Sequence, residues 1–173
     1  MKGDMNMPIS NFSELEILKI AKGIEEAGYD FYKKAEAKFE DEDVKKMFEY
    51  LAAEEMEHKD TFQSLYERVA EKLEKEEEAK YLYDELTTDY LKAISETAIF
   101  NTNGLTSNKL ENIYSVKDAL MIGLQAEKDA ILFYEAIVRN TKFEMTKLVL
   151  ERLIKEEVKH LHKFKKLIDG LEK

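Results

Sequence analysis

The sequence repeats itself once, with an offset of 102 residues and no gap between the two copies. The repeat covers charged positions as well as apolar ones. It pairs Glu25 with Glu127, Phe31-Tyr32 with Phe133-Tyr134, Leu51 with Leu153, Glu55 with Glu157, His58 with His160 and Phe62 with Phe164. One fixed offset across many positions is the signature of a duplicated structural unit. We therefore expect an internal duplication with approximate two-fold symmetry.

Four long segments have the spacing of amphipathic helices. Their apolar residues recur every three or four positions, which is the period of a helix with one buried face. The segments cover residues 13–39, 43–76, 115–140 and 141–169. Ser13 with Glu16 forms a capping box at the first segment, and Thr141 with Glu144 predicts the start of the last. We expect Gly170 to end the last helix.

Short connections join the first segment to the second and the third to the fourth, so each pair should form an antiparallel hairpin. The hairpins cover about residues 13–76 and 115–171, and residues 77–114 connect them. This connection contains a further predicted helix at residues 81–100, followed by a polar, turn-rich stretch. We predict an all-α fold, a four-helix bundle of two duplicated hairpins with a long helical crossover. The 173 residues are expected to form one domain.

The absence of cysteine narrows the kinds of site that the chain can carry. It excludes disulfides, thiolate zinc sites, iron–sulfur clusters and thiol nucleophiles. The formal net charge of −10 argues against nucleic-acid binding, which needs clustered Lys and Arg. No apolar run is long enough to span a membrane, and residues 1–10 lack the apolar core of a secretory signal. We expect a cytoplasmic protein.

Three polar positions in each half lie on the apolar stripes of the predicted helices. They are Glu25, Glu55 and His58 in the first half, and Glu127, Glu157 and His160 in the second. Unpaired carboxylates in a core cost several kcal/mol each. Four carboxylates and two imidazoles that converge on one bundle axis therefore need a compensating charge. Two divalent cations would supply it.

The spacing of these residues fits a pair of metal ions. In Glu-x-x-His, a carboxylate and an imidazole share one helical face and can reach the same ion. One Glu from each of two helices, with a Glu-x-x-His from each of the others, is the pattern of di-iron and di-manganese bundles. Oxygen and nitrogen ligands without sulfur favour iron or manganese over a structural zinc site. We expect two iron ions, with manganese or zinc as alternatives. Glu54 and Glu156 compete as ligands because each lies four residues before its histidine, but the stripe favours Glu55 and Glu157.

The chain resembles the ferritin-like superfamily, and most closely the di-iron domain of rubrerythrins. The residues that carry this resemblance are Glu25 with Phe31-Tyr32, Glu54-Glu55-Met56-Glu57-His58, Glu127 with Phe133-Tyr134, and Glu156-Glu157-Val158-Lys159-His160. It implies terminal ligation by Glu25 and Glu127, bridging by Glu55 and Glu157, and one metal ion each for His58 and His160. It also implies that Tyr32 and Tyr134 hydrogen-bond ligand carboxylates, although both suit the core equally well.

Two departures from the family pattern affect what the resemblance implies. Full-length rubrerythrins carry a rubredoxin domain with four cysteines, so electrons would here come from a separate, rubredoxin-like protein. The extra glutamate that rubrerythrins place one turn after the third-helix ligand is Ala130 here, and its repeat mate is Gly28. The remaining six-ligand set is closer to the symmetric ferroxidase site of bacterioferritins.

The expected function is that of an oxidoreductase whose reduced iron pair reacts with hydrogen peroxide or oxygen, as in rubrerythrin-like protection against oxidative stress. Two alternatives stay open. One is a ferroxidase that stores or delivers iron, and the other is a metal-free helical interaction module. A homodimer is also expected, because the helical connection could pack on, or swap into, a second copy.

Overall fold

The computed structural model describes residues 11–76, 81–101 and 113–171. These residues form helices without named strands, as the sequence predicts. The helices are α1 (Glu14–Lys38), α2 (Glu42–Lys75), α3 (Glu85–Thr97), α4 (Val116–Asn140) and α5 (Glu144–Leu171). The helix of the connection is shorter than the predicted 81–100, because the Asp84 side chain caps it at Thr87 and the backbone is extended again at Ala98. The polar stretch after it lies almost entirely outside the described residues.

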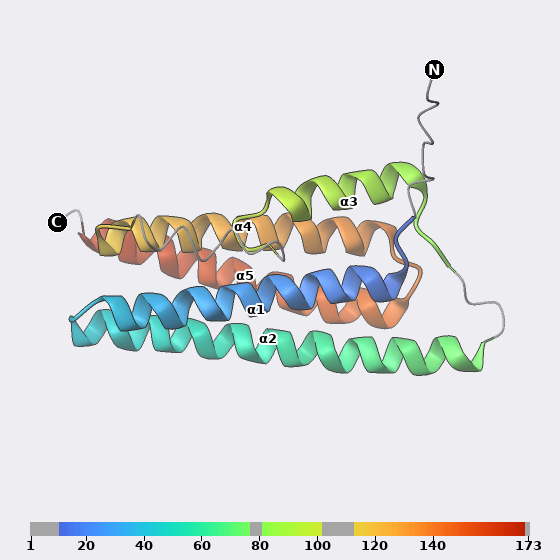
Figure 1. The fold of residues 1–173 in the computed structure, drawn as a ribbon, viewed down its shortest axis with the longest axis horizontal. Coiled ribbons are helices and arrows are strands. Elements are labelled where there is room, and N and C mark those ends of the chain that lie inside the picture. Colours follow the sequence, from blue (N-terminus) through green and yellow to red (C-terminus); the bar gives the residue numbers. More distant parts are fainter. Residues whose placement is uncertain (1–10, 77–80, 102–112, 172–173) are drawn as a thin grey trace, which may run out of the picture.

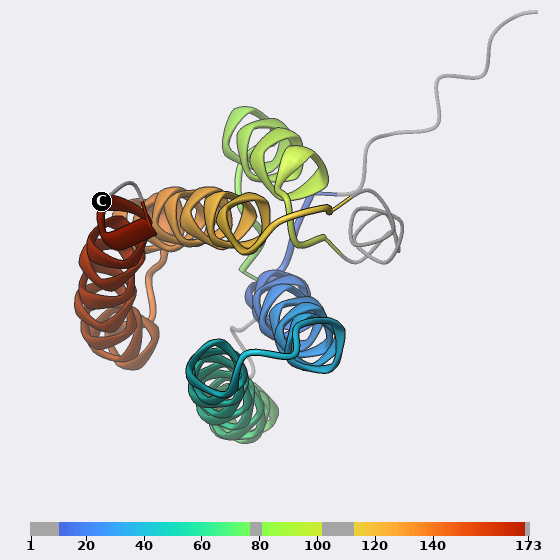
Figure 2. The ribbon, with the colours of Figure 1, turned by 90° about the vertical axis from the view of Figure 1, so that its left-hand side faces the viewer.

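Helices α1, α2, α4 and α5 form the predicted four-helix bundle (Figure 1). The closest packing is within the pairs α1–α2 and α4–α5, which are the two hairpins, and the hairpins meet mainly through α1 with α4 and α2 with α5. Helix α3 lies on the outer side of α4, on the side of the molecule away from α2 (Figure 2). No helix in the described part of the chain combines the length and the apolar character needed to cross a membrane.

Side-chain caps set most of the helix N-termini. Ser13 and Glu16 form the predicted capping box, and Asp41 accepts hydrogen bonds from the first turn of α2. The prediction for Thr141 is wrong, because its hydroxyl donates to the buried carboxylate of Glu14 and accepts from the Phe143 amide instead of capping α5. The prediction for Gly170 is also wrong, since α5 continues through it to Leu171.

The crossover is attached to the end of the bundle through Glu14, a buried acid in the first turn of α1. The Tyr83 hydroxyl donates to Glu14 Oε2 at 2.5 Å, and the Thr141 hydroxyl donates to Oε1 at 2.9 Å. The Tyr83 amide also donates to the Phe12 carbonyl. These contacts join α1, the start of the crossover and the α4–α5 connection, and they satisfy a carboxylate that would otherwise be costly to bury.

The close packing around Gly123 in α4 predicts that alanine destabilises the protein at this position but not at Gly170. A β-carbon there would lie 2.5 Å from Cζ of Phe164, whereas one at Gly170 would meet nothing within 4 Å. Gly123→Ala should therefore lower the free energy of unfolding by about 1–3 kcal/mol through overpacking. Gly170→Ala should leave it unchanged or raise it by up to about 1 kcal/mol through helix propensity. Denaturant unfolding of both variants measures the difference, and equal effects would contradict the packing.

Candidate metal centre

The six predicted ligand residues lie together in the middle of the bundle. Glu25 projects from α1, Glu55 and His58 from α2, Glu127 from α4, and Glu157 and His160 from α5. All six are at most 5% exposed. The long apolar stripes of the helices bring them there, because each glutamate or histidine occupies a core position of its own stripe. Four buried glutamates with two histidines give the centre more acidic than basic groups.

Glu157 lies between the two histidines. Its Oε1 is 2.9 Å from Nδ1 of His58, and its Oε2 is 3.0 Å from Nδ1 of His160. The histidine rings are nearly parallel, with centroids 5.7 Å apart. Glu25 Oε2 is 3.6 Å from Nδ1 of His58, and Glu127 Oε1 is 3.8 Å from Nδ1 of His160. Each histidine therefore presents the same ring nitrogen to two carboxylates.

These contacts define two groups of three donor atoms that share one residue. Glu25, His58 and Glu157 form the first group, and Glu127, His160 and Glu157 form the second, each with its donor atoms within 4.8 Å of one another. Glu55, the repeat mate of Glu157, is in neither group. It lies against Gly28, where a β-carbon would be 3.0 Å from its Cδ. Gly28 thus leaves the space that the Glu55 side chain occupies.

The two tyrosines hydrogen-bond the upstream glutamates of the opposite hairpin. The Tyr32 hydroxyl donates to Glu127 Oε1 at 3.4 Å, and the Tyr134 hydroxyl donates to Glu25 Oε1. Both rings are fully buried, so each tyrosine is a core aromatic and a hydrogen-bond donor at once. The 102-residue offset pairs Tyr32 with Tyr134 and Glu25 with Glu127, so the two contacts are equivalent. The two-fold relation of the halves is therefore present in the structure as well as in the sequence.

Burial and charge shift the pKa values of the centre. Burial alone would lower the pKa of His58, but the carboxylates of Glu157 and Glu25 raise it to about 11. Burial raises the pKa of Glu55, and the charge of Glu25 raises it further. Burial and the charge of Glu157 raise the pKa of Glu127. Burial would raise the pKa of Glu157 too, but the histidines outweigh it and hold that pKa below its usual range.

Loading the centre with a divalent cation should release protons. Imidazole and carboxylate ligands must be deprotonated, whereas the raised pKa values keep protons on His58 and favour protonated Glu55 and Glu127. Metal affinity should therefore rise with pH between about 6 and 8. Calorimetric titration with zinc, in two buffers of different ionisation enthalpy, counts the released protons. A binding heat that does not depend on the buffer would contradict this.

A pocket of about 280 Å³ opens on the outer side of the two histidines. It is lined by Tyr50, Glu54, Glu57, His58, Glu156, Lys159, His160 and Lys163. The Lys163 ammonium lies over the Tyr50 ring, 3.4 Å from its centre, at the rim. The sequence analysis missed Tyr50 and Lys163, although each lies about one turn from Glu54 or His160 on the same helix. The pocket gives small molecules and ions a route from solvent to the imidazoles. His162, in contrast, is exposed on the surface.

The family model for rubrerythrin matches residues 16–168, which include all six residues of the centre and both tyrosines. The chain belongs to the rubrerythrin family. It is thus of the ferritin-like di-iron carboxylate type, a family that implies a dinuclear metal site. No curated protein sequence matches the chain.

Two solved structures share the rubrerythrin-family fold of this chain at low sequence identity. One is a candidate ferritin-like diiron-carboxylate protein from Thermotoga maritima, with a TM-score of 0.65 and 22% identity over 92% of this chain and 96% of its own. The other is KatB, a manganese catalase from Anabaena PCC7120, with a TM-score of 0.61 and 21% identity over 100% of this chain and 82% of its own. At these identities the likeness shows the ferritin-like bundle alone.

Proposed function

We propose that this chain holds two metal ions, iron in the native protein, in the centre described above. The ligands are Glu25, Glu55, His58, Glu127, Glu157 and His160. The observation that carries the proposal is the pair of three-residue groups that share Glu157. The donor set also fits the ions at atomic level. His58 Nδ1 and Glu157 Oε1 form an ion pair at 2.9 Å, and neither atom has a hydrogen-bond partner among the described residues. Buried polar atoms without partners are rare and need an explanation, which a bound cation provides.

The proposed reaction is the reduction of hydrogen peroxide, or of oxygen, at this centre. A reduced pair of such ions supplies the two electrons that, with two protons, convert one hydrogen peroxide to two waters. Glu157 lies between the two histidines, so its carboxylate would offset positive charge of both metal ions. Tyr32 and Tyr134 hold the carboxylates of Glu127 and Glu25 in place. The pocket beside the histidines admits a small oxidant, while the surrounding aromatic core excludes larger substrates.

Family membership supports iron, and the manganese catalase among the structural neighbours keeps manganese as the main alternative. A separate rubredoxin-like protein would return the ions to the reduced state, since the chain has no cysteine of its own for an iron–sulfur site. We also propose that the protein is cytoplasmic and forms a homodimer.

The experiment is to mix ferrous-loaded protein, free of oxygen, with hydrogen peroxide in a stopped-flow instrument. We expect one peroxide to be consumed per pair of ferrous ions, and faster than by the Glu55→Ala variant. His160→Ala should abolish the fast phase. His162→Ala is the matched control, because it removes an exposed histidine from the same helix and should leave the rate unchanged. A rate that is the same in wild type, Glu55→Ala and His160→Ala would reject the proposal.

Ferroxidation is the second candidate, and the pocket favours it. Three glutamates, Glu54, Glu57 and Glu156, line the pocket together with two lysines, and this small excess of acid suits attraction of cations. In this case iron is the substrate as well as the resident metal. Oxidation of ferrous iron in air that continues well beyond two ions per chain would support ferroxidation. Oxidation that stops at two would leave the peroxide reaction as the function.

A further inference from the structure

A second pocket, of about 390 Å³, opens between α2 and α5. Thr61, Ser64 and Arg68 line it from α2, and Val149 and Arg152 line it from α5. We call it the arginine pocket. Its lining includes none of the six residues of the metal centre, so it is a separate feature of the molecule.

The arginine pocket contains most of the arginine of the chain. Only three of the 27 lysine and arginine residues are arginines, and two of these three, Arg68 and Arg152, line this pocket. Unlike lysine, arginine presents a planar fork of N–H groups that matches the oxygens of a carboxylate or a phosphate in pairs. Two such cations in one pocket repel each other, and a bound oxyanion offsets that repulsion.

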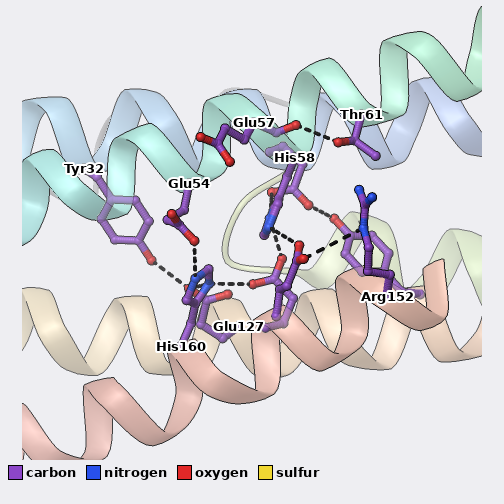
Figure 3. Close-up of polar contacts among 12 residues, drawn as sticks. Tyr32, Glu54, Glu57, His58, Thr61, Glu127, Arg152 and His160 are labelled. Carbon is purple, nitrogen blue, oxygen red and sulfur yellow. Dashed lines mark hydrogen bonds and ion pairs between the residues drawn. The ribbon is translucent and has the colours of Figure 1, made fainter. Parts of the chain in front are cut away.

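The donor groups of the arginine pocket have few partners within the chain. Among the described residues, the structure records neither an ion pair nor a hydrogen bond for the side chains of Arg68 and Ser64, which lie one turn apart on α2. Arg152 reaches from α5 toward Thr61 of α2 (Figure 3). Its recorded partner is Glu156, whose Oε1 lies 3.8 Å from Nε of Arg152. That is well beyond the roughly 2.7–2.9 Å of a charge-assisted hydrogen bond.

The duplication does not repeat the residues of the arginine pocket. Thr61 and Arg152 have Lys163 and Tyr50 as their repeat mates, and Arg68 has Gly170. In the other half, the Lys163 ammonium lies over the Tyr50 ring, so two long side chains meet there. In the arginine pocket, Thr61 is short and its hydroxyl donates to a carbonyl of its own helix, which leaves the space in front of Arg152 open. The paired arginines are therefore a feature of one half alone.

We propose that the arginine pocket binds a phosphate group, either free phosphate or the phosphate of a small ester. Arg68 and Arg152 hold its oxygens from opposite helices, and the Ser64 hydroxyl donates to a further oxygen. Donors from three side chains suit a phosphate, which has more acceptor oxygens than a carboxylate. The inference does not rest on the metal centre.

The rest of the lining fits such a ligand. Leu65 and Val149 give the pocket an apolar part, against which the body of a phosphate ester can pack. Asp60 is the acid in the lining, so two cations and one anion leave the pocket with a net positive charge. The formal net charge of the whole chain is −10, which makes this a local cationic site on an acidic protein.

The test uses the full chain, loaded with zinc and labelled with nitrogen-15 in its arginines. Three arginines give three side-chain Nε–H signals, which the variants Arg68→Gln, Arg139→Gln and Arg152→Gln assign. Titration with inorganic phosphate should shift the Arg68 and Arg152 signals together, with one dissociation constant. Arg139 is the matched control, because its side chain is 60% exposed on α4, outside the pocket. Its signal should stay in place.

The variants test whether the two arginines hold one ligand. In Arg68→Gln, the Arg152 signal should need about 10- to 100-fold more phosphate for the same shift, because a charge-assisted contact is lost. Arg152→Gln should do the same to the Arg68 signal, and Arg139→Gln should change neither response. Arg68→Lys keeps the charge but loses the fork, so its affinity should fall between those of Arg68→Gln and wild type.

The choice of probe separates the two sources of the phosphate group. Phenyl phosphate that binds more tightly than inorganic phosphate would support an ester, and weaker or equal binding would support free phosphate. The absence of any shift, equal shifts of all three arginine signals, or acetate that binds as tightly as phosphate would overturn the inference. The metal-free chain should respond as the zinc-loaded chain does. A response that requires zinc would place the phosphate at the metal centre and overturn the inference, while the proposed function would stand.

Discussion

Replacing Glu157 with glutamine should cost the chain both metal ions. Glu157 is the one residue that belongs to both groups of donor atoms, within 3.0 Å of Nδ1 of each histidine. Glutamine has nearly the same volume but no charge, and it cannot give an anionic oxygen to each side. Removing a residue that only hydrogen-bonds a metal ligand lowers metal affinity by about 10- to 100-fold. Removing the charge of Glu157, a proposed ligand of both ions, should therefore lower the affinity for each ion by more than about 100-fold. Metal titration followed by elemental analysis measures it.

Two matched variants make this expectation specific. Glu151→Gln removes an exposed charge from the same helix and should bind metal as wild type does. Glu55→Gln, the repeat mate, should weaken binding less than Glu157→Gln, because Glu55 is in neither group of donor atoms. Far-ultraviolet circular dichroism should confirm that each variant is helical. A Glu157→Gln protein that keeps two ions would show that another residue organises the centre.

Removing the metal should lower the melting temperature by roughly 10 °C. Ions that bind only the folded chain stabilise it by mass action, by about 4 kcal/mol at a free metal concentration one thousand times the dissociation constant. In a domain of this size, each kcal/mol corresponds to about 2–4 °C. The effect should be large because the ions would bind acids and imidazoles that are buried in the middle of the bundle. Scanning calorimetry of iron- or zinc-loaded protein, with and without a chelator, measures it.

The control is a chain that keeps the bundle but not the imidazoles. In His58→Ala with His160→Ala, the chelator should shift the melting temperature by less than about 2 °C, since little metal is held. His162→Ala should respond to the chelator as wild type does, because that histidine is exposed. A wild-type melting temperature that the chelator leaves unchanged would favour the metal-free helical module over a metal protein.

The bundle and the convergence of the six residues follow from patterns that the sequence contains directly. A helical stripe records which face is buried, and the constant offset shows that both halves are built alike. Contacts between the two hairpins depend on how the hairpins pack against each other, and neither the stripes nor the offset shows which residues meet. Glu54 is one position off its stripe, so the sequence places it beside the site without showing that its partner is His160.

The unequal positions of Glu55 and Glu157 have a similar origin. Their own helices are alike at these positions. The residue beside Glu55 is Gly28, however, whereas its repeat mate is Ala130, and the crossover occurs only once and cannot obey the two-fold symmetry. Phe100, at the end of the crossover, packs against Phe31 and Tyr32. It also lies 3.2 Å from the position of a β-carbon on Gly28, next to the Glu55 carboxylate. The predicted capping role of Thr141 is wrong for a related reason, because the partner of its hydroxyl, Glu14, is 127 residues away in sequence.

The most direct test of the paired-metal centre is the metal content of the chain purified from iron-replete cells without added metal. Elemental analysis combined with the protein concentration gives ions per chain. The six-residue centre predicts a value close to two, mostly iron, which falls to near zero in Glu157→Gln. A wild-type value near zero, or a single ion that survives in Glu157→Gln, would contradict the account.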